Sequence, residues 1–178
     1  MKRLTKLMSV FAAGALFMGA LAGCGGSKDA GKAGDTIKVG ALLEMTGGSA
    51  SFGISSKNGI DLALKKINEK GVLGGKKLSL VVADTKSEAS EATNGMQKLV
   101  SQDKVVAVIG PNQSSAVIAA GAINNGSKVL GITPMGTNPD VTVDPKTKKT
   151  KEYNFRACFI DPFQGTVMAN YAFKQGAK

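Results

Sequence analysis

The stretch from Val105 to Ile109, with the Gly-Pro pair that follows it, restricts the possible folds of this chain more than any other feature. Five consecutive apolar residues, mostly β-branched, predict a strand buried on both faces, as strands are in parallel sheets. The Gly-Pro pair ends the strand because proline has no N–H to give to a ladder. Ser114 and Ser115 are N-cap candidates for a helix over the apolar run 116–123. Because open α/β sheets bind ligands beyond the carboxyl ends of their strands, we expect a ligand site here.

The rest of the chain alternates between strand-like and helix-like segments. Strands are expected at Thr36–Leu43, Leu78–Ala83, Val105–Ile109, Val129–Ile132 and Tyr153–Ile160. Helices are expected around Ile60 up to a stop at Gly71, from about Ser87, from Ser114 and over Asp161–Phe173. Between the first strand and the first helix, Glu44–Gly53 is predicted to be a Gly/Ser-rich turn that holds one aromatic residue, Phe52. This alternation predicts an α/β fold in which helices flank a parallel sheet.

Three of the expected helices carry apolar residues at helical spacing on one face. The residues expected to face inward are Ile60, Ala63, Leu64 and Ile67 in the first helix, Ala92, Met96, Leu99 and Val100 in the second, and Val167, Met168 and Tyr171 in the last. The last helix is expected to begin with Asp161 as its N-cap and Pro162 as its first residue.

Residues 1–23 have the pattern of an export signal. A basic start (Lys2, Arg3 and Lys6) precedes an apolar segment over residues 7–20, which is shorter than the about 20 residues that a spanning helix needs. Leu21-Ala22-Gly23-Cys24 resembles the bacterial lipobox, in which the cysteine receives diacylglycerol and becomes the mature N-terminus. We therefore expect a lipoprotein signal peptide over 1–23, lipidation at Cys24 and a flexible tether over 24–35. An ordinary export signal or a membrane anchor with an incidental cysteine is the alternative.

Residue usage excludes several kinds of chemistry. The chain has no histidine, which excludes catalysis by a Cys–His or Ser–His pair. With Cys24 assigned to lipid, Cys158 has no intramolecular partner and is expected to be a buried strand residue. A net charge of +10 could indicate nucleic-acid binding, but the lysines are scattered, aromatic residues make up 5% and no DNA-binding module is present. Solubility, or loose attraction to an anionic membrane surface, accounts for the charge better.

The turn over residues 110–115 could in principle cradle a phosphate. It has neither the spacing of a P-loop nor that of the dinucleotide-binding glycine motif. Asp84 follows a strand, but no second acid, histidine or metal-binding cluster converges on it. We therefore expect no enzymatic activity, no metal and no cofactor, with an exported α/β enzyme as a remote alternative.

Several short motifs occur in a characteristic order from about Thr36 to the end of the chain. They are Ile37-Lys38-Val39-Gly40, Thr46-Gly47 with Phe52-Gly53, Asn58-Gly59 with Leu62-Ala63 and Ile67-Asn68, Ile109-Gly110-Pro111 with Ser114, Thr133-Pro134 with Thr137-Asn138-Pro139, Phe155-Arg156, and Asp161 with Gln164-Gly165. In this order they resemble the type I periplasmic binding proteins, in particular the leucine/isoleucine/valine-binding receptors of ABC importers.

The resemblance implies two α/β lobes that close over an amino acid and pass it to a permease in the membrane. Residues 36–160 would form an incomplete first lobe, and 161–178 the first helix of a second lobe, so the chain is expected to be an N-terminal fragment. Such receptors are tethered to the cell surface in Gram-positive bacteria, and we expect a monomer. A receptor of the same fold for an amide, urea or an aromatic acid remains open as an alternative.

The same resemblance implies the ligand contacts. Ser114 would bind the ligand carboxylate, helped by N–H groups at the start of its helix. The Met135 carbonyl and Thr137 would bind the ammonium, and an N–H of Gly136 or Thr137 would also be available to the carboxylate. Phe52 would lie against the ligand. Met135-Gly136 replaces the small Ala/Gly pair common in the family, and the acidic residue that completes the ammonium site belongs to the second lobe.

Overall fold

The computed structural model describes residues 36–71 and 74–177. The expected signal peptide, the tether and the lipidation site Cys24 lie outside these residues. Within the described part of the chain, no helix combines the length and the apolar character needed to cross a membrane.

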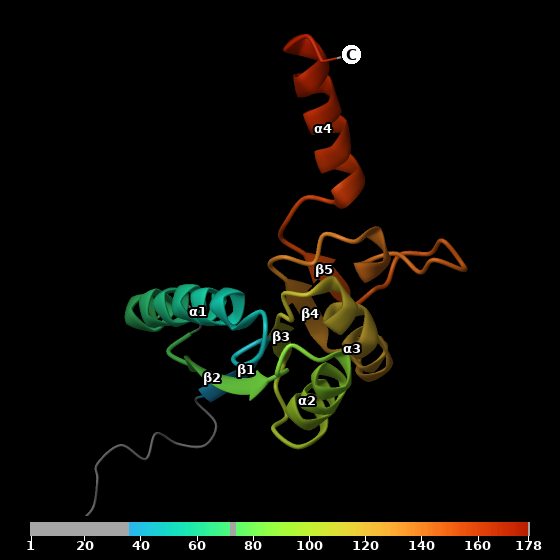
Figure 1. Cartoon of the computed structure of the whole chain (residues 1–178). Coiled ribbons are helices and arrows are strands. Elements are labelled where there is room, and N and C mark those ends of the chain that lie inside the picture. The colour runs from blue at the N-terminus through green and yellow to red at the C-terminus, as the bar shows by residue number, and fades with distance from the viewer. Residues whose placement is uncertain (1–35, 72–73, 178) are drawn as a thin grey trace, which may run out of the picture. The chain divides into compact units, whose positions relative to one another are not determined.

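Five strands of the described chain form one parallel sheet, which confirms the expected fold class. They are β1 (Thr36–Leu43), β2 (Lys77–Asp84), β3 (Ala107–Ile109), β4 (Leu130–Thr133) and β5 (Asn154–Arg156), in the spatial order β2-β1-β3-β4-β5. Val39 of β1 is paired with Leu80 on one side and with Ala107 on the other. Because the strands are parallel, their carboxyl ends lie at one common edge of the sheet (Figure 1).

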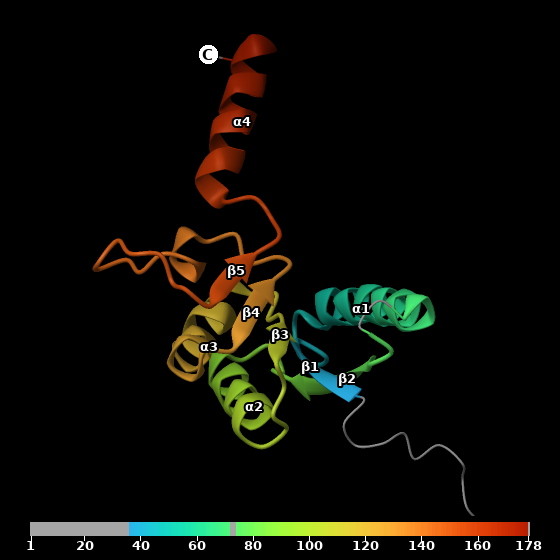
Figure 2. The same cartoon turned by 180° about the vertical axis from the view of Figure 1, so that it is seen from behind.

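Helices lie on both faces of this sheet. α1 (Ala50–Lys70) packs on one face, against β1 and β2, whereas α2 (Ala89–Ser101) and α3 (Ser114–Ser127) pack on the other (Figure 2). The larger core lies under α2 and α3 and consists of Leu42, Ala92, Met96, Leu99, Val105, Val108, Ala116 and Ala120. This confirms the inward face expected for the second helix. A smaller cluster of Ala41, Leu43 and Ile60 lies under α1.

Several element boundaries differ from the sequence-based expectation. α1 begins at Ala50, so the predicted turn over 44–53 is wrong in its second half and Phe52 is helical. β3 contains only Ala107–Ile109, because Val105 is buried in the α2–α3 core without taking part in the strand ladder. β5 likewise contains only Asn154–Arg156. A run of apolar residues indicates which residues are buried, and buried residues continue beyond those that pair in a sheet.

The C-terminal part of the described chain departs further from expectation. Helix α4 (Asp161–Lys174) has Ile160 rather than Asp161 as its N-cap, and none of its residues is buried. The inward face predicted for it is therefore wrong: Val167, Met168 and Tyr171 are all exposed. Both views show no other helix or strand of the described chain lying along α4 (Figure 1, Figure 2).

Cys158 was expected in a buried strand, but it lies in a bend beyond β5 and is only half-buried. Partial burial raises the pKa of its thiol, against the opposing effect of the nearby Arg156. A thiol with a raised pKa has a smaller thiolate fraction at neutral pH and is a weaker nucleophile than an ordinary cysteine.

Candidate functional site

The candidate site is built from three loops at the carboxyl edge of the sheet. They follow β1 (residues 44–49), β3 (110–113) and β4 (134–138), and each leads into or lies beside a helix start. Parallel strands bring these loops to the same edge although they are far apart in sequence. Four of the five residues predicted to touch a ligand, Ser114, Met135, Gly136 and Thr137, belong to the second and third loops or follow them directly.

Ser114 is the first residue of α3 and not its N-cap, which is Gln113. The Ser114 hydroxyl accepts a hydrogen bond from the Asn138 N–H at 3.3 Å, so it joins the start of α3 to the turn after β4. Among the described residues, the N–H groups of Ser114, Ser115 and Ala116 have no hydrogen-bond acceptor. These N–H groups lie at the positive end of the helix dipole, which is a favourable place for an anion.

The turn after β4 is fixed by Thr133. Its hydroxyl donates to the Pro111 carbonyl at 2.6 Å and accepts from the N–H groups of Met135 at 3.3 Å and Gly136 at 2.9 Å. The Gly136 N–H is therefore already used inside the protein. Of the two N–H groups expected near a ligand carboxylate, only that of Thr137 is without a partner in the described chain. Met135 is 40% exposed, whereas Gly136 is buried.

Arg156 holds the same turn from the side of β5. Its guanidinium donates to the carbonyls of Gly136 at 2.7 Å, Asn138 at 2.9 Å and Pro139 at 3.2 Å, and to the Thr142 hydroxyl at 2.9 Å. The planar fork of arginine suits several acceptors at once, which a lysine could not reproduce. Sequence reasoning noted Arg156 only as part of a motif and assigned it no contact.

Glu44 is a further residue that sequence reasoning missed. It directly follows β1, and its side chain is completely buried. One carboxylate oxygen accepts from the N–H groups of Asn112 at 3.1 Å and Gln113 at 3.0 Å, and the other accepts from Asn112 at 3.2 Å. An acidic residue immediately after an apolar strand was the available signal, because such a position lies at the carboxyl edge of the sheet. Glu44 therefore fixes the backbone that leads into α3.

Asp84, the last residue of the neighbouring strand β2, organises the loop after β1. Its carboxylate accepts from the N–H groups of Met45, Thr46 and Lys86 and from the Thr46 hydroxyl. Slight burial raises the pKa of this carboxyl, but the hydrogen bonds from Thr46, Lys86 and Met45 outweigh burial and lower it. With four donors on its carboxylate, Asp84 holds the loop after β1 in position.

Phe52 lies on the first turn of α1 and is 51% exposed. The turn is attached to the start of α3, because the Gln113 side-chain amide donates to the Ser49 hydroxyl at 2.7 Å. The Ser56 hydroxyl, one helical turn further on, donates to Asn112 at 3.1 Å. Phe52 is thus an exposed aromatic side chain on the element joined to the start of α3.

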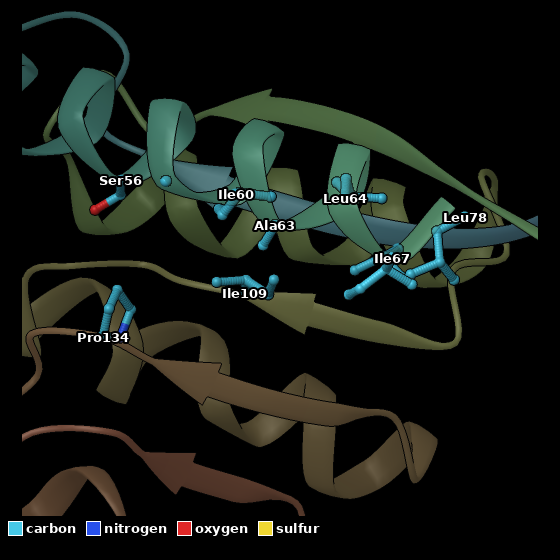
Figure 3. A pocket seen from close by; sticks show the side chains of 10 residues that line it. Ser56, Ile60, Ala63, Leu64, Ile67, Leu78, Ile109 and Pro134 are labelled. Atoms are coloured by element: carbon cyan, nitrogen blue, oxygen red, sulfur yellow. The ribbon is translucent and has the colours of Figure 1, made fainter. Parts of the chain in front are cut away.

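An apolar pocket of about 350 Å³ lies elsewhere, under α1 on the face of the sheet opposite α2 and α3. Figure 3 shows Ile60 and Ala63 of α1 on the side facing Ile109 of β3, with Pro134 at one end. Ser56 contributes the one hydroxyl among its lining residues. A pocket with so few polar groups does not suit a charged amino acid, and none of the predicted ligand contacts lines it.

Comparison with known proteins relates this geometry to one family. A family model described as "Periplasmic binding protein" matches residues 36–178. An "Amino acid binding protein" of Pseudomonas aeruginosa is 36% identical over 135 residues, which are 76% of this chain. Those residues cover 35% of that relative, so the chain spans about a third of its length.

Two solved structures share the fold. The branched-chain amino acid transporter substrate binding protein LivJ from Streptococcus pneumoniae, in complex with isoleucine, superposes with a TM-score of 0.70 at 38% identity. The match covers 77% of this chain and 38% of LivJ. A solute binding protein of an ABC transporter from Rhodopseudomonas palustris, in complex with 3,4-dihydroxy benzoic acid, gives 0.71 at 28% identity and covers 81% and 38% of the two chains.

Proposed function

The chain belongs to the periplasmic binding protein family, and we propose that it is an extracytoplasmic receptor that captures a branched-chain or other hydrophobic amino acid for an ABC permease. One observation carries this proposal: the start of α3, with its Ser114 hydroxyl and unpaired N–H groups, is bonded directly to the turn that holds Thr137. This contact supports the proposal, because a zwitterion needs donors for its carboxylate beside acceptors for its ammonium.

In this proposal, the N–H groups and hydroxyl at the start of α3 bind the ligand carboxylate. The Met135 carbonyl and the Thr137 hydroxyl accept hydrogen bonds from the ammonium, and Phe52 contacts the side chain of the ligand. Closure of a second lobe over this edge, and transfer to the permease, complete the cycle. These steps are binding and release, and they require no catalytic residue. The isoleucine complex of the pneumococcal relative supports this ligand class.

A same-fold receptor for an aromatic acid is the second candidate. The Rhodopseudomonas neighbour, which holds 3,4-dihydroxy benzoic acid, favours this possibility. An aromatic acid carries a carboxylate but no ammonium, so it would use the start of α3 and leave the acceptors of the turn after β4 unpaired. Titration of the whole encoded protein with leucine, isoleucine, valine and dihydroxybenzoate decides between the two candidates.

The Ser114→Ala and Thr137→Val variants test the contacts themselves. Each removes one hydroxyl and keeps the backbone, so each is expected to cost about 1.5–3 kcal/mol, or roughly ten- to hundredfold in affinity. The loss is expected to be the same for leucine, isoleucine and valine, because the two hydroxyl groups contact the carboxylate and the ammonium, which all three ligands have. Isothermal titration calorimetry of the whole encoded protein measures it.

Ser115→Ala is the matched control, since Ser115 occupies the same helix start but is exposed. It is expected to leave affinity within about twofold of the unmodified protein. Unchanged affinity in the Ser114→Ala and Thr137→Val variants, or a changed ranking among the three ligands, would show that the contacts are wrongly assigned.

We also propose that the protein is anchored to the outer face of the cell membrane through Cys24. The lipobox-like Leu21-Ala22-Gly23-Cys24 after a short apolar segment supports this. Mass spectrometry of the mature protein is expected to find diacylglyceryl-cysteine at its N-terminus, and Cys24→Ala is expected to release unlipidated or unprocessed protein. A mature N-terminus within residues 25–35 would contradict the proposal.

A further inference from the structure

The completely buried carboxylate of Glu44 has no cationic partner in the described chain. The ion pairs there involve other residues, and the groups that bond Glu44 are the backbone N–H groups of Asn112 and Gln113. Both are donors, which matches the ionised carboxylate, a group that only accepts hydrogen bonds. A buried, unpaired negative charge influences its surroundings strongly because little water screens it.

This charge lies beside the place where the ligand carboxylate is proposed to bind. Gln113, whose N–H bonds Glu44, directly precedes Ser114, and consecutive Cα atoms are only about 3.8 Å apart. Glu44 therefore uses the N–H groups just before α3, and the ligand would use those of its first turn. Two negative charges near one helix start repel each other, and both are stabilised by the positive end of the same helix dipole.

We infer that Glu44 determines specificity at this site by favouring zwitterions over ligands that carry a carboxylate alone. The inference rests on the proposed function. A simple carboxylate brings a second negative charge next to Glu44, and nothing on the ligand offsets it. An amino acid brings an ammonium with its carboxylate, so its net charge is zero and the repulsion is largely cancelled.

Two other charged groups contact the loops around the site. The Arg156 guanidinium bonds carbonyls of the turn after β4, and its positive charge attracts any carboxylate. The Asp84 carboxylate bonds the loop after β1 and is half-buried. Both are retained when only Glu44 is changed, so their influence is common to the original and substituted proteins. A comparison of two ligands then isolates the charge of Glu44.

The test compares leucine with 4-methylpentanoate, which has the same skeleton without the amino group. Calorimetry of the whole encoded protein gives the ratio of the two dissociation constants. In the Glu44→Gln variant, 4-methylpentanoate is expected to gain about tenfold relative to leucine, because the side chain keeps its size and loses its charge. Glu44→Met, a second neutral side chain of similar length, is expected to shift the ratio in the same direction.

Two control variants separate charge from structure. Glu44→Asp keeps the charge and is expected to keep the ratio within about twofold of the original protein. Asp84→Asn removes a neighbouring carboxylate that does not touch α3, and it is expected to weaken both ligands equally or neither. Circular dichroism tests whether each variant is folded.

The outcomes distinguish this inference from the proposed function. If leucine does not bind the unmodified protein, the proposed function fails. If leucine binds but the ratio is unchanged in folded Glu44→Gln and Glu44→Met, the specificity role of Glu44 is wrong. Loss of folding in both neutral variants would also contradict the inference, because Glu44 would then act only through the fold. A large change in the ratio of the two dissociation constants in Glu44→Asp or Asp84→Asn would show that the charge of Glu44 is not the cause.

Discussion

Replacing Gly53 with alanine is expected to destabilise the fold by about 3 kcal/mol or more. Gly53 is buried in the first turn of α1, where a Cβ atom would overlap the backbone of Glu44 and lie 2.5 Å from its carbonyl carbon. Backbone atoms at a strand end cannot move aside as a flexible side chain can. Overpacking of this kind costs about 1–3 kcal/mol and sometimes more. Urea-induced unfolding of the whole encoded protein, followed by circular dichroism, measures the loss.

Gly59→Ala provides the matched control within the same helix. A Cβ atom there would have no neighbour within 4 Å, and alanine is preferred over glycine in a helix interior by about 0.5–1 kcal/mol. The two identical substitutions are thus expected to change stability in opposite directions. Equal effects would mean that α1 and the end of β1 are not in the close contact described.

The contact between Gly53 and Glu44 also bears on function. The start of α1 packs directly against the backbone of Glu44, and the Glu44 carboxylate bonds the backbone that leads into α3. A displaced α1 would therefore disturb two of the loops that form the candidate site. We expect the Gly53→Ala variant that remains folded at low temperature to bind ligand more weakly than Gly59→Ala.

The sequence was sufficient to predict the layered fold because burial leaves a strong local pattern. Continuous apolar runs predicted the parallel strands, and the spacing of Ala92, Met96 and Leu99 predicted the inner face of α2. The start of α1 was missed because the glycines and serines over residues 47–53 are typical of turns as well. The exposed face of α4 could not be predicted, because periodicity says which residues are apolar but not what packs against them.

The candidate site was predicted less completely than the fold. Its location follows from topology, since parallel strands bring their carboxyl ends together. The particular hydrogen bonds depend on contacts between residues far apart in sequence, such as Glu44 with Gln113 and Ser114 with Asn138. No local pattern encodes such pairs. The N-cap prediction for Ser114 is wrong for this reason: its hydroxyl accepts from the neighbouring turn, and Gln113 occupies the cap position.

Replacing Arg156 with methionine is expected to cost about 3 kcal/mol or more of stability and to weaken ligand binding. The guanidinium is the shared donor of four oxygen atoms between Gly136 and Thr142. Hydrogen bonds to charged groups contribute about 1.5–3 kcal/mol each, and the loss is less than their sum because water reaches part of this turn. The whole encoded protein is studied by urea unfolding and by leucine titration.

Arg156→Lys and Thr142→Val show which property of the arginine matters. Lysine keeps the charge but has no planar fork, so it is expected to restore less than half of the stability lost in Arg156→Met. Thr142→Val removes one of the four acceptors and is expected to cost about 1.5 kcal/mol, at the lower end of that range because the other three contacts of the guanidinium remain. If Arg156→Lys were as stable as the original protein, charge alone would be sufficient and the geometry of the fork would be irrelevant. If it instead lost leucine affinity together with stability, the turn that carries Thr137 would owe its binding geometry to the carbonyl contacts of Arg156.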